Sequence, residues 1–315
     1  MEMVTTKGGE MGHPSILVVG SANVDLVTRV PRCPKPGESL IGSAFATVPG
    51  GKGANQAVAA ARLGARTWFA GCVGNDAFGV MQRQTLGAEG IHLEYLETHS
   101  WEPTGTAVIL IGDDGQNSIV VTPSANYGIT PADIEKLEPV FEHIDAVLIQ
   151  LEIRLETVEA VLTVARRRQV LSILDAGPAQ QVSERLIGLA SIVSPNETEA
   201  EAMTGIVVHD VDTARAAASR LRAMGADEVV LKLGALGGFY LGSQGECYVP
   251  AFRVEAVDTV AAGDAFTAAL ALQWGNTPVH DALRFANAAG ALAATHHGAQ
   301  PSMPTRGAVE ALIRA

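Results

Sequence analysis

The sequence has few cysteines, a shortage of basic residues and no long apolar run, and each absence excludes a class of protein. Only three cysteines occur among 315 residues, and their wide spacing fits neither a disulfide framework nor a zinc site. Lys and Arg number 22 against 34 Asp and Glu, and the resulting net charge of −12 argues against nucleic acid or an anionic membrane as the main partner. No stretch approaches the roughly 18 apolar residues of a membrane span. We therefore expect a protein of a reducing compartment, the cytoplasm, with no nucleic-acid or membrane partner.

The remaining composition suits a large buried core, because 47% of the residues are hydrophobic and only 18% are charged. The length allows one large α/β domain or two small ones. Residues 1–14 include Glu2, Lys7 and Glu10 and lack the apolar centre of a signal peptide, so we expect a disordered leader. Residues 15–315 are expected to form a single α/β domain.

Apolar runs and helical patterns alternate along this domain. We expect strands at residues 16–19, 66–73, 146–151, 170–175, 191–194 and 228–233. We expect helices at residues 54–63, 78–86, 155–168, 213–224, 265–274, 280–296 and 305–313. Strand–helix alternation with such crossovers predicts a mostly parallel sheet covered by helices on both faces.

Two regions interrupt the alternation. Residues 26–48 hold several prolines, and residues 106–111 and 117–122 are two strand patterns joined by Gly112-Asp113-Asp114-Gly115, a strong hairpin signal. We expect a small β-sheet from about residues 22–50 and 103–123, which could serve as a lid that keeps water from a reacting group. Surface hairpins without such a role, or a surface for self-association, are the alternatives.

The most informative segment is Asp258-Thr259-Val260-Ala261-Ala262-Gly263-Asp264-Ala265-Phe266, which has the pattern of a turn of small residues before a helix. The N–H groups of a first helical turn lack intrahelical partners and attract anions. Asp264 stands beside them and could take a proton from a hydroxyl, which together would suit phosphoryl transfer to an alcohol. Close packing at Gly263 and a simple helix cap at Asp264 explain the same residues equally well.

A second motif, Gly50-Gly51-Lys52-Gly53-Ala54-Asn55-Gln56, precedes an Ala-rich helix. It has neither the Walker A spacing nor that of a dinucleotide fingerprint. Its small residues would let a ligand lie against the backbone while Lys52 and Asn55 donate to sugar hydroxyls; a flexible connector with a helix cap is the alternative. Asn23, Asp25 and Glu152 follow predicted strands, where they are either ligands or turn formers.

A third motif is Ser194-Pro195-Asn196-Glu197-Thr198-Glu199. Asn196 and Glu199 have the spacing of a capping box, which is the simpler interpretation. At the carboxyl end of a parallel strand they could also order water around Mg²⁺. The adjacent His296 and His297 point in different directions on any regular element, so we expect no transition-metal site there.

Taken together, the motifs resemble those of the ribokinase (phosphofructokinase-B) family of sugar and nucleoside kinases. The likeness covers residues 15–313, and its most specific parts are the segments 50–57 and 258–264. Pro195-Asn196-Glu197-Thr198-Glu199-Ala200-Glu201 and Gly298-Ala299-Gln300-Pro301-Ser302 support it. The resemblance implies a three-layer α/β/α fold with a small β-sheet lid.

The resemblance also implies roles for individual residues. Asp264 would be the base on a sugar's primary hydroxyl, with Ala261, Ala262 and Gly263 as the anion hole. The sugar would contact Asn23, Asp25, Gly51, Lys52, Gly53, Ala54, Asn55 and Glu152. The nucleotide would contact Asn196, Lys232, Leu233, Gly234, Ala235, Leu236, Gly237, Gly263 and Asn287. Glu199 would organise Mg²⁺ through water, and K⁺ would bind, largely through backbone oxygens, at Asp258, Val260, Ala293, His296, Gly298 and Ser302.

The implied reaction is ATP-dependent phosphorylation of D-ribose at O5, giving D-ribose 5-phosphate and ADP, by a homodimer joined through the lid. Two departures from the family pattern weaken parts of this expectation. Lys232 to Gly237 read Lys-Leu-Gly-Ala-Leu-Gly where Thr-Leu-Gly-Ser-Arg-Gly is frequent, and Ser124-Ala125-Asn126 replaces a Gly-Ala-Asn motif. A kinase for 2-deoxyribose, fructose or adenosine, or a non-catalytic sugar sensor, is the alternative.

Overall fold

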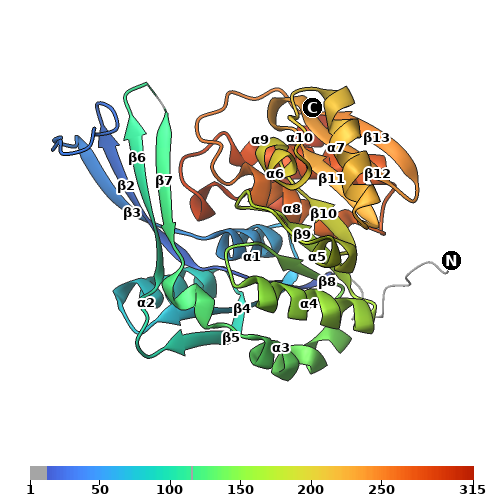
Figure 1. Cartoon of the computed structure of the whole chain (residues 1–315), viewed down its shortest axis with the longest axis horizontal. Helices are drawn as coiled ribbons and strands as arrows, with labels where there is room; N and C mark the ends of the chain where they lie inside the picture. Colours follow the sequence, from blue (N-terminus) through green and yellow to red (C-terminus); the bar gives the residue numbers. More distant parts are fainter. Residues whose placement is uncertain (1–12, 115) are drawn as a thin grey trace.

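A large, mostly parallel sheet forms the centre of the protein (Figure 1). The computed structural model describes residues 13–114 and 116–315. Strand order is β13-β12-β11-β10-β9-β8-β1-β4-β5, and the strands from β11 to β5 run parallel, whereas β12 and β13 pair antiparallel at one edge. The strand bounds are β1 (Ser15–Val19), β4 (Arg66–Gly74), β5 (His92–His99), β8 (Ala146–Ile149), β9 (Leu171–Asp175), β10 (Ile192–Ser194), β11 (Glu228–Lys232), β12 (Gly237–Gly242) and β13 (Gly245–Pro250).

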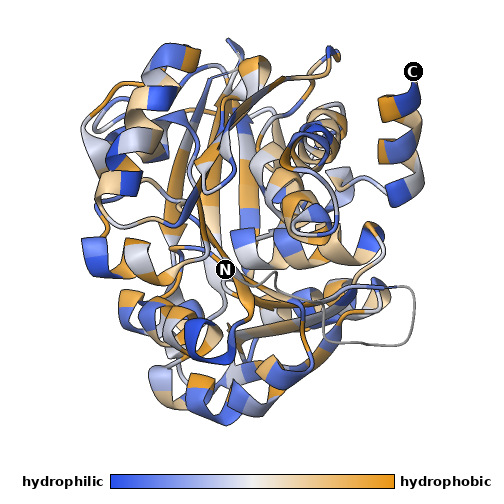
Figure 2. Cartoon of the chain, turned by 90° about the vertical axis from the view of Figure 1, so that its right-hand side faces the viewer, coloured by the Kyte–Doolittle hydropathy of each residue, from blue (hydrophilic) through white to orange (hydrophobic). Residues whose placement is uncertain are grey.

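Helices cover both faces of this sheet. One face packs against α1 (Lys52–Arg62), α2 (Ala77–Ala88), α8 (Ala262–Gln273), α9 (Val279–Ala293) and α10 (Arg306–Arg314). The other packs against α3 (Pro131–Leu137), α4 (Leu155–Arg168), α5 (Glu184–Leu189), α6 (Glu197–Thr204) and α7 (Val211–Ala223). In Figure 2 the apolar strands lie between helices whose outward surfaces are largely hydrophilic. The predicted three-layer α/β/α fold is confirmed.

Strand β1 shows why both faces need a cover. Ile16 and Val18 belong to one apolar cluster and Leu17 and Val19 to the other, because successive side chains of a strand point to opposite faces. A strand apolar on both sides is typical of a parallel sheet between two helix layers.

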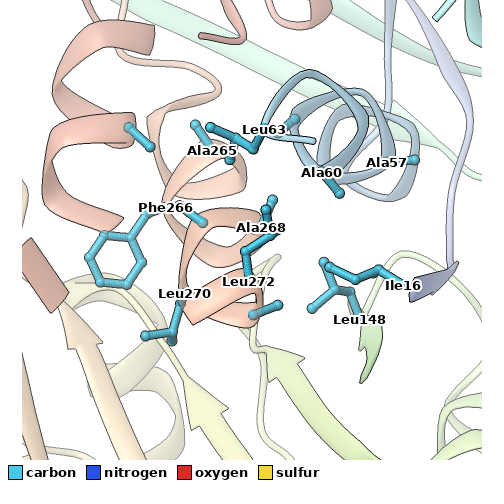
Figure 3. Packing of buried hydrophobic residues seen from close by; sticks show 14 of the residues in the cluster. Ile16, Ala57, Ala60, Leu63, Leu148, Ala265, Phe266, Ala268, Leu270 and Leu272 are labelled. Carbon is cyan, nitrogen blue, oxygen red and sulfur yellow. The ribbon is translucent and has the colours of Figure 1, made fainter. Parts of the chain in front are cut away.

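Helix α8 packs against α1 through small side chains. Ala57 and Ala60 of α1 and Ala265 and Ala268 of α8 are all fully buried, and Figure 3 shows the two helices side by side above Ile16 and Leu148. Because alanine side chains allow helices to approach closely, the polar residues at the start of α1 come within hydrogen-bonding distance of Asp264 in α8.

A second, four-stranded sheet projects from the main body (Figure 1). It has the order β3-β2-β6-β7 and consists of β2 (Asn23–Val30), β3 (Ala44–Gly50), β6 (Gly105–Gly112) and β7 (Asn117–Thr122). The predicted smaller sheet is therefore present, and β6 and β7 are the antiparallel pair expected from the hairpin signal. Gly115, in the predicted turn, lies outside the described residues.

Some expectations need correction. Of the predicted leader, residues 1–12 lie outside the described residues, but His13 and Pro14 contact the chain just before and at the start of β4, at Gly64 and Arg66. The helix expected to reach residue 296 ends at Ala293, and the chain then turns, with Gly298 at a φ of 85°. Among the described residues, no helix is long and apolar enough to cross a membrane.

Candidate active site

Polar side chains gather where the carboxyl ends of the parallel strands meet the first turns of α1 and α8. Chain segments leaving β1, β8, β9 and β11 supply Asn23, Glu152, Asp175 and Lys232. Carboxyl ends of neighbouring parallel strands lie at one edge of a sheet, which is the usual place for a ligand in an open α/β fold.

Asp264 lies at the centre of this group, in the first turn of α8, with only 3% of its surface exposed. One carboxylate oxygen accepts a hydrogen bond from Asn55 (2.9 Å) and the other from Gln56 (3.1 Å). Burial raises the pKa of Asp264 to about 6; Lys52 opposes the rise and Asp175 adds to it. At neutral pH this carboxylate is therefore ionised, yet it binds protons more readily than an exposed aspartate does.

The turn before α8 presents backbone amides beside Asp264. Ala261 is the N-cap residue and is buried, and the N–H of Ala262 donates to the carbonyl of Thr259 at 3.3 Å. The N–H groups of Gly263 and Asp264 follow in the first helical turn, where intrahelical acceptors are absent. Of the predicted anion hole, Gly263 is therefore a better donor to a ligand than Ala262, and the N–H of Asp264, which was not predicted, is available as well.

Carboxylate and amide groups line the side nearer the small sheet. Glu152 accepts hydrogen bonds from the backbone of Lys52 (3.1 Å) and the side chain of Asn23 (3.4 Å), and also from Ser21. Asn126 donates to the side-chain oxygen of Asn23 at 2.6 Å and fixes its orientation. Glu152 and Asn23 thus present fixed acceptors and donors at one side of Asp264.

Asp25 completes this side. Burial, followed by the nearby charges of Glu152 and Asp264, raises the pKa of Asp25 to about 7. Its carboxylate lies against Gly50, where a Cβ atom would be only 2.6 Å from Oδ1 of Asp25. Gly51 has a φ of 91°, a conformation that side chains rarely adopt, so the glycines of this motif have a structural requirement as well as space for a ligand.

The side chain of Lys52 extends toward Gly177 and Glu199. A Cβ atom on Gly177 would lie 2.6 Å from both the Lys52 ammonium and Oε1 of Glu199, so these two groups flank Gly177. Burial favours neutral Lys52, but the charges of Asp264, Asp175, Glu199 and Glu152 outweigh it and raise the pKa of Lys52 above its usual value. The backbone N–H of Lys52 therefore contacts Glu152, a predicted sugar contact, while its ammonium lies near Glu199, which is predicted to organise Mg²⁺.

The capping-box prediction at α6 is confirmed. Asn196 accepts from the N–H of Glu199 and Glu199 accepts from the N–H of Asn196, both at 2.8 Å. Glu199 is almost completely buried, and its carboxylate lies 3.9 Å from the Lys232 ammonium. Glu199 can therefore cap α6 and lie in the candidate site at the same time.

The residues predicted to contact the nucleotide differ in their settings. Gly234, Ala235 and Leu236 form an exposed turn, whereas Lys232 is buried and its ammonium is 2.7 Å from Asp175. Asn287 donates to the carbonyls of Val249 (2.9 Å) and Pro250 (3.3 Å), so its amide nitrogen holds α9 to the end of β13. Whether these residues contact a nucleotide stays a prediction.

The predicted monovalent-cation residues come from two segments that the structure brings together. Asp258 accepts from the N–H of Val260 (3.1 Å) and of Gly298 (3.0 Å), and its own N–H donates to Ala294. Ser302 donates to the carbonyl of Ala299 at 2.8 Å. The side chains of His296 and His297 are exposed, so a cation here would depend on backbone oxygens.

Several residues of the site were missed by the sequence analysis. Gln56 bridges Asp264 and Asp175, donating to them at 3.1 and 2.8 Å, and it accepts from Gln150 at 2.6 Å. Thr267 donates to Asp175 at 3.1 Å. Asp175 and Gln150 could have been recognised from their positions at the ends of predicted strands, which is the signal that identified Glu152.

A hollow of about 550 Å³ reaches the site at Glu152. Val121 of β7 borders it on the small sheet, and Glu152, Arg154 and Pro178 border it on the main body. A second hollow of about 410 Å³ shares Pro123, Tyr127 and Arg154 with the first. The small sheet therefore forms one wall of the opening next to Glu152.

The comparisons with known proteins agree with this geometry. Residues 13–306 match the model of the pfkB family carbohydrate kinase. The chain is 40% identical to the ribokinase of Haemophilus influenzae over 293 residues, 93% of this chain and 96% of that protein. It is 40% identical to the ribokinase of Bacillus subtilis over 301 residues, 95% of this chain and 99% of that protein. Its fold matches the structure of Arabidopsis thaliana ribokinase complexed with ribose and ATP, with a TM-score of 0.87 and 35% identity over 96% of this chain and 100% of that one.

Proposed function

Because the chain belongs to the pfkB family of carbohydrate kinases, we propose that it transfers the γ-phosphoryl group of ATP to O5 of D-ribose. The products are D-ribose 5-phosphate and ADP. The observation that carries this proposal is the position of Asp264, a buried carboxylate with a pKa of about 6 next to the amides that begin α8.

Asp264 is the proposed base. Asn55 and Gln56 hold its two oxygens, so the carboxylate is fixed in orientation before a substrate binds. As O5 attacks the γ-phosphorus, its proton passes to Asp264, the bond between phosphorus and the departing ADP oxygen breaks, and the amides of Gly263 and Asp264 face the charge on the transferred group.

The sugar is proposed to lie between Asp264 and the small sheet. Asn23 and Asp25 offer a donor and an acceptor that suit vicinal hydroxyls, and Glu152 accepts beside them. The motif at residues 50–56 would contact the ring through Gly51, Lys52, Gly53, Ala54 and Asn55, and its small residues Gly51, Gly53 and Ala54 would let the ring lie against the backbone. The small sheet acts as the lid, which is consistent with Val121 bordering the hollow at Glu152.

Mg²⁺ is proposed to accompany ATP. The described residues hold no group of three or more His, Cys, Asp or Glu side chains that could bind a metal directly. Glu199 already accepts one backbone hydrogen bond through Oε2, which leaves Oε1 for a metal-bound water. When bound, Mg²⁺ would neutralise charge on the phosphate oxygens. Asn196, Lys232 and the exposed turn at Gly234 are the proposed nucleotide contacts.

K⁺ is proposed to bind at the loops of Asp258 and Gly298. The hydrogen bonds from Val260 and Gly298 orient the Asp258 carboxylate, and carboxylate and carbonyl oxygens are suitable ligands for a hard monovalent cation. The remaining proposed ligands are Ala293, His296 and Ser302. The Asp258 loop leads directly into the turn before α8, so an ordered cation would help to hold the anion hole.

A homodimer through the lid is proposed from one face of the small sheet. Phe45, Val108 and Val120 share this face and are 67%, 43% and 66% exposed. Apolar side chains clustered on an exposed sheet mark a surface for association. We place the enzyme in the cytoplasm, which suits its three free cysteines. Sedimentation of the purified protein tests the dimer.

An assay of ADP release with D-ribose, 2-deoxyribose, fructose and adenosine tests the function. We expect ribose to give the highest kcat/KM, and K⁺ to give a higher rate than Na⁺. Another preferred acceptor would correct the substrate, and equal rates in the two salts would contradict the cation loops. Ribose binding without ADP release for any acceptor would instead favour a sugar sensor.

A further inference from the structure

Lys232 and Asp175 form a buried ion pair next to the anion hole. The ammonium lies 2.7 Å from Oδ1 of Asp175, and the two side chains are 8% and 0% exposed. Lys232 ends β11 and Asp175 ends β9, so the pair bridges the carboxyl ends of two strands on either side of β10. Burying both charges costs free energy that their attraction repays only in part, so the pair needs a reason beyond stability.

Asp175 is the better satisfied partner. It also accepts hydrogen bonds from Gln56 (2.8 Å) and Thr267 (3.1 Å). Burial would raise the pKa of Asp175, but the charges of Lys232 and Lys52 outweigh this and hold its pKa below the usual range. Asp175 is therefore a fixed anion within the polar network that also orients Asp264.

Lys232 is less well satisfied. An ammonium has three donor hydrogens, and among the described residues it makes one hydrogen bond, to Asp175. Glu199 is 3.9 Å away, too far for a hydrogen bond. Donor capacity thus remains on a cation that is almost completely buried.

The position of this cation indicates its acceptor. A Cβ atom on Gly263 would lie 3.8 Å from both the Cδ atom and the ammonium of Lys232. The end of the Lys232 side chain therefore lies beside the first turn of α8, and its ammonium is 3.9 Å from Glu199. Five carboxylates lie in or beside the site, those of Asp25, Glu152, Asp264, Asp175 and Glu199. The ammonium groups of Lys52 and Lys232 are the positive charges available to an anionic phosphoryl group, and Lys232 is the one that lies next to Gly263.

We propose that Lys232 is a catalytic residue whose ammonium binds the phosphoryl group during transfer, with Asp175 as the counter-ion that holds it in place. This rests on the proposed kinase function and gives Lys232, already a proposed nucleotide contact, a role in the transfer step itself. The O5 proton still goes to Asp264, and the bond from phosphorus to O5 forms as the bond to ADP breaks. Lys232 exchanges no proton and contributes charge and hydrogen bonds to the phosphoryl oxygens.

Three variants test this proposal: Lys232→Met, Asp175→Asn and the double variant Lys232→Met/Asp175→Asn. The single Lys232 change leaves Asp175 without its principal partner and is expected to destabilise the fold. The double variant removes both charges together, so it should unfold near the wild-type temperature. Lys136→Met, which removes an exposed lysine paired with Asp133, is the control.

In the double variant we expect kcat to fall by about 10²-fold or more, the usual effect of removing one donor to a developing oxyanion, with KM for the sugar changed by less than about threefold. We also expect ADP to bind nearly as well as to wild type. Aluminium fluoride, bound together with ADP and the sugar, mimics the phosphoryl group during transfer, and in wild type it should make ADP bind more tightly. In the double variant we expect this gain in ADP affinity to fall by a similar factor. A purely structural role would not weaken the mimic selectively.

A double variant whose kcat returns to near the wild-type value would overturn the proposal, because Lys232 would then only neutralise Asp175. A loss of ADP affinity equal to the loss for the mimic would also overturn it, since Lys232 would then bind the nucleotide in general. If the wild-type protein prefers another acceptor, the same measurements are made with that acceptor. If the wild-type protein releases no ADP with any of the tested acceptors, the proposed function fails, and this inference fails with it.

Discussion

The replacement Asp264→Asn separates the proposed base from the structure around it. Asn has the same shape, so Asn55 and Gln56 keep their positions, but it cannot accept a proton at neutral pH. We expect kcat for the sugar to fall by about 10²–10⁴-fold, equivalent to about 3–5 kcal/mol of transition-state stabilisation, with KM for the sugar nearly unchanged.

The same variant should not lose stability. Raising the pKa of Asp264 from 3.8 to about 6 means that its charged form costs roughly 3 kcal/mol in the folded state. The folded protein retains the Asp264 proton between these two pH values while the unfolded chain releases it, so wild-type stability falls as pH rises through this window. The neutral Asn avoids that cost and loses about 1 kcal/mol through one mismatched hydrogen bond. Above pH 6 the variant should therefore unfold at an equal or higher temperature than wild type.

The assay is steady-state ADP release together with thermal unfolding at about pH 8. Asp212→Asn, a change at a side chain that is 88% exposed, is the control and should leave both measurements unchanged. A kcat for Asp264→Asn within about threefold of wild type, in a protein that remains folded, would refute the assignment of the base.

Three further predictions follow from single features of the structure. In wild type, kcat should decline as pH falls through about 6, because protonated Asp264 cannot act as a base; a flat profile from about pH 5 to 8 would contradict this. Gly50→Ala should raise KM for the sugar about tenfold, because its Cβ would lie 2.6 Å from Oδ1 of Asp25, and an unchanged KM would remove Asp25 from the sugar site. Gln169→Gly should raise the unfolding temperature by about 2 °C, since Gln169 ends α4 at a φ of 55°, whereas Gln169→Ala should not.

The sequence predicted the central part of the fold well because its strands are apolar throughout. The predicted helix at 155–168 coincides with α4, and the strand expected at 16–19 lies within β1. Strands β5 and β13 were missed because they lie at the two edges of the sheet, where exposure permits polar residues such as Glu94 and Glu97 of β5. Strand β12 lies between β11 and β13, and it was missed because its glycines weaken the strand pattern.

The candidate site was predictable where a motif is local. Gly51, Asn55 and Asp264 lie in two short segments, and the structure joins them through the hydrogen bond from Asn55 to Asp264. The pairing of Lys232 with Asp175, 57 residues away, depends on the order of β9, β10 and β11 in the sheet, which no local pattern specifies. Asn126, 103 residues from Asn23, was noted only as a departure from a motif, yet it orients the Asn23 side chain.

Ser124 shows how such a departure is accommodated. It has a φ of 45°, in the left-handed region that a glycine at this position of the family motif would adopt without strain. Ala125 and Asn126, which follow it, are nevertheless buried. The replacement of glycine by Ser124 therefore keeps the hydrogen bond from Asn126 to the side chain of Asn23.

A crystal structure of the protein with D-ribose and a non-hydrolysable ATP analogue tests the central claim most directly. The account predicts O5 within about 3 Å of a carboxylate oxygen of Asp264, with the γ-phosphorus on the opposite side of O5 and close to the amide of Gly263. An O5 atom more than about 5 Å from Asp264, with the small sheet closed over the sugar, would contradict it.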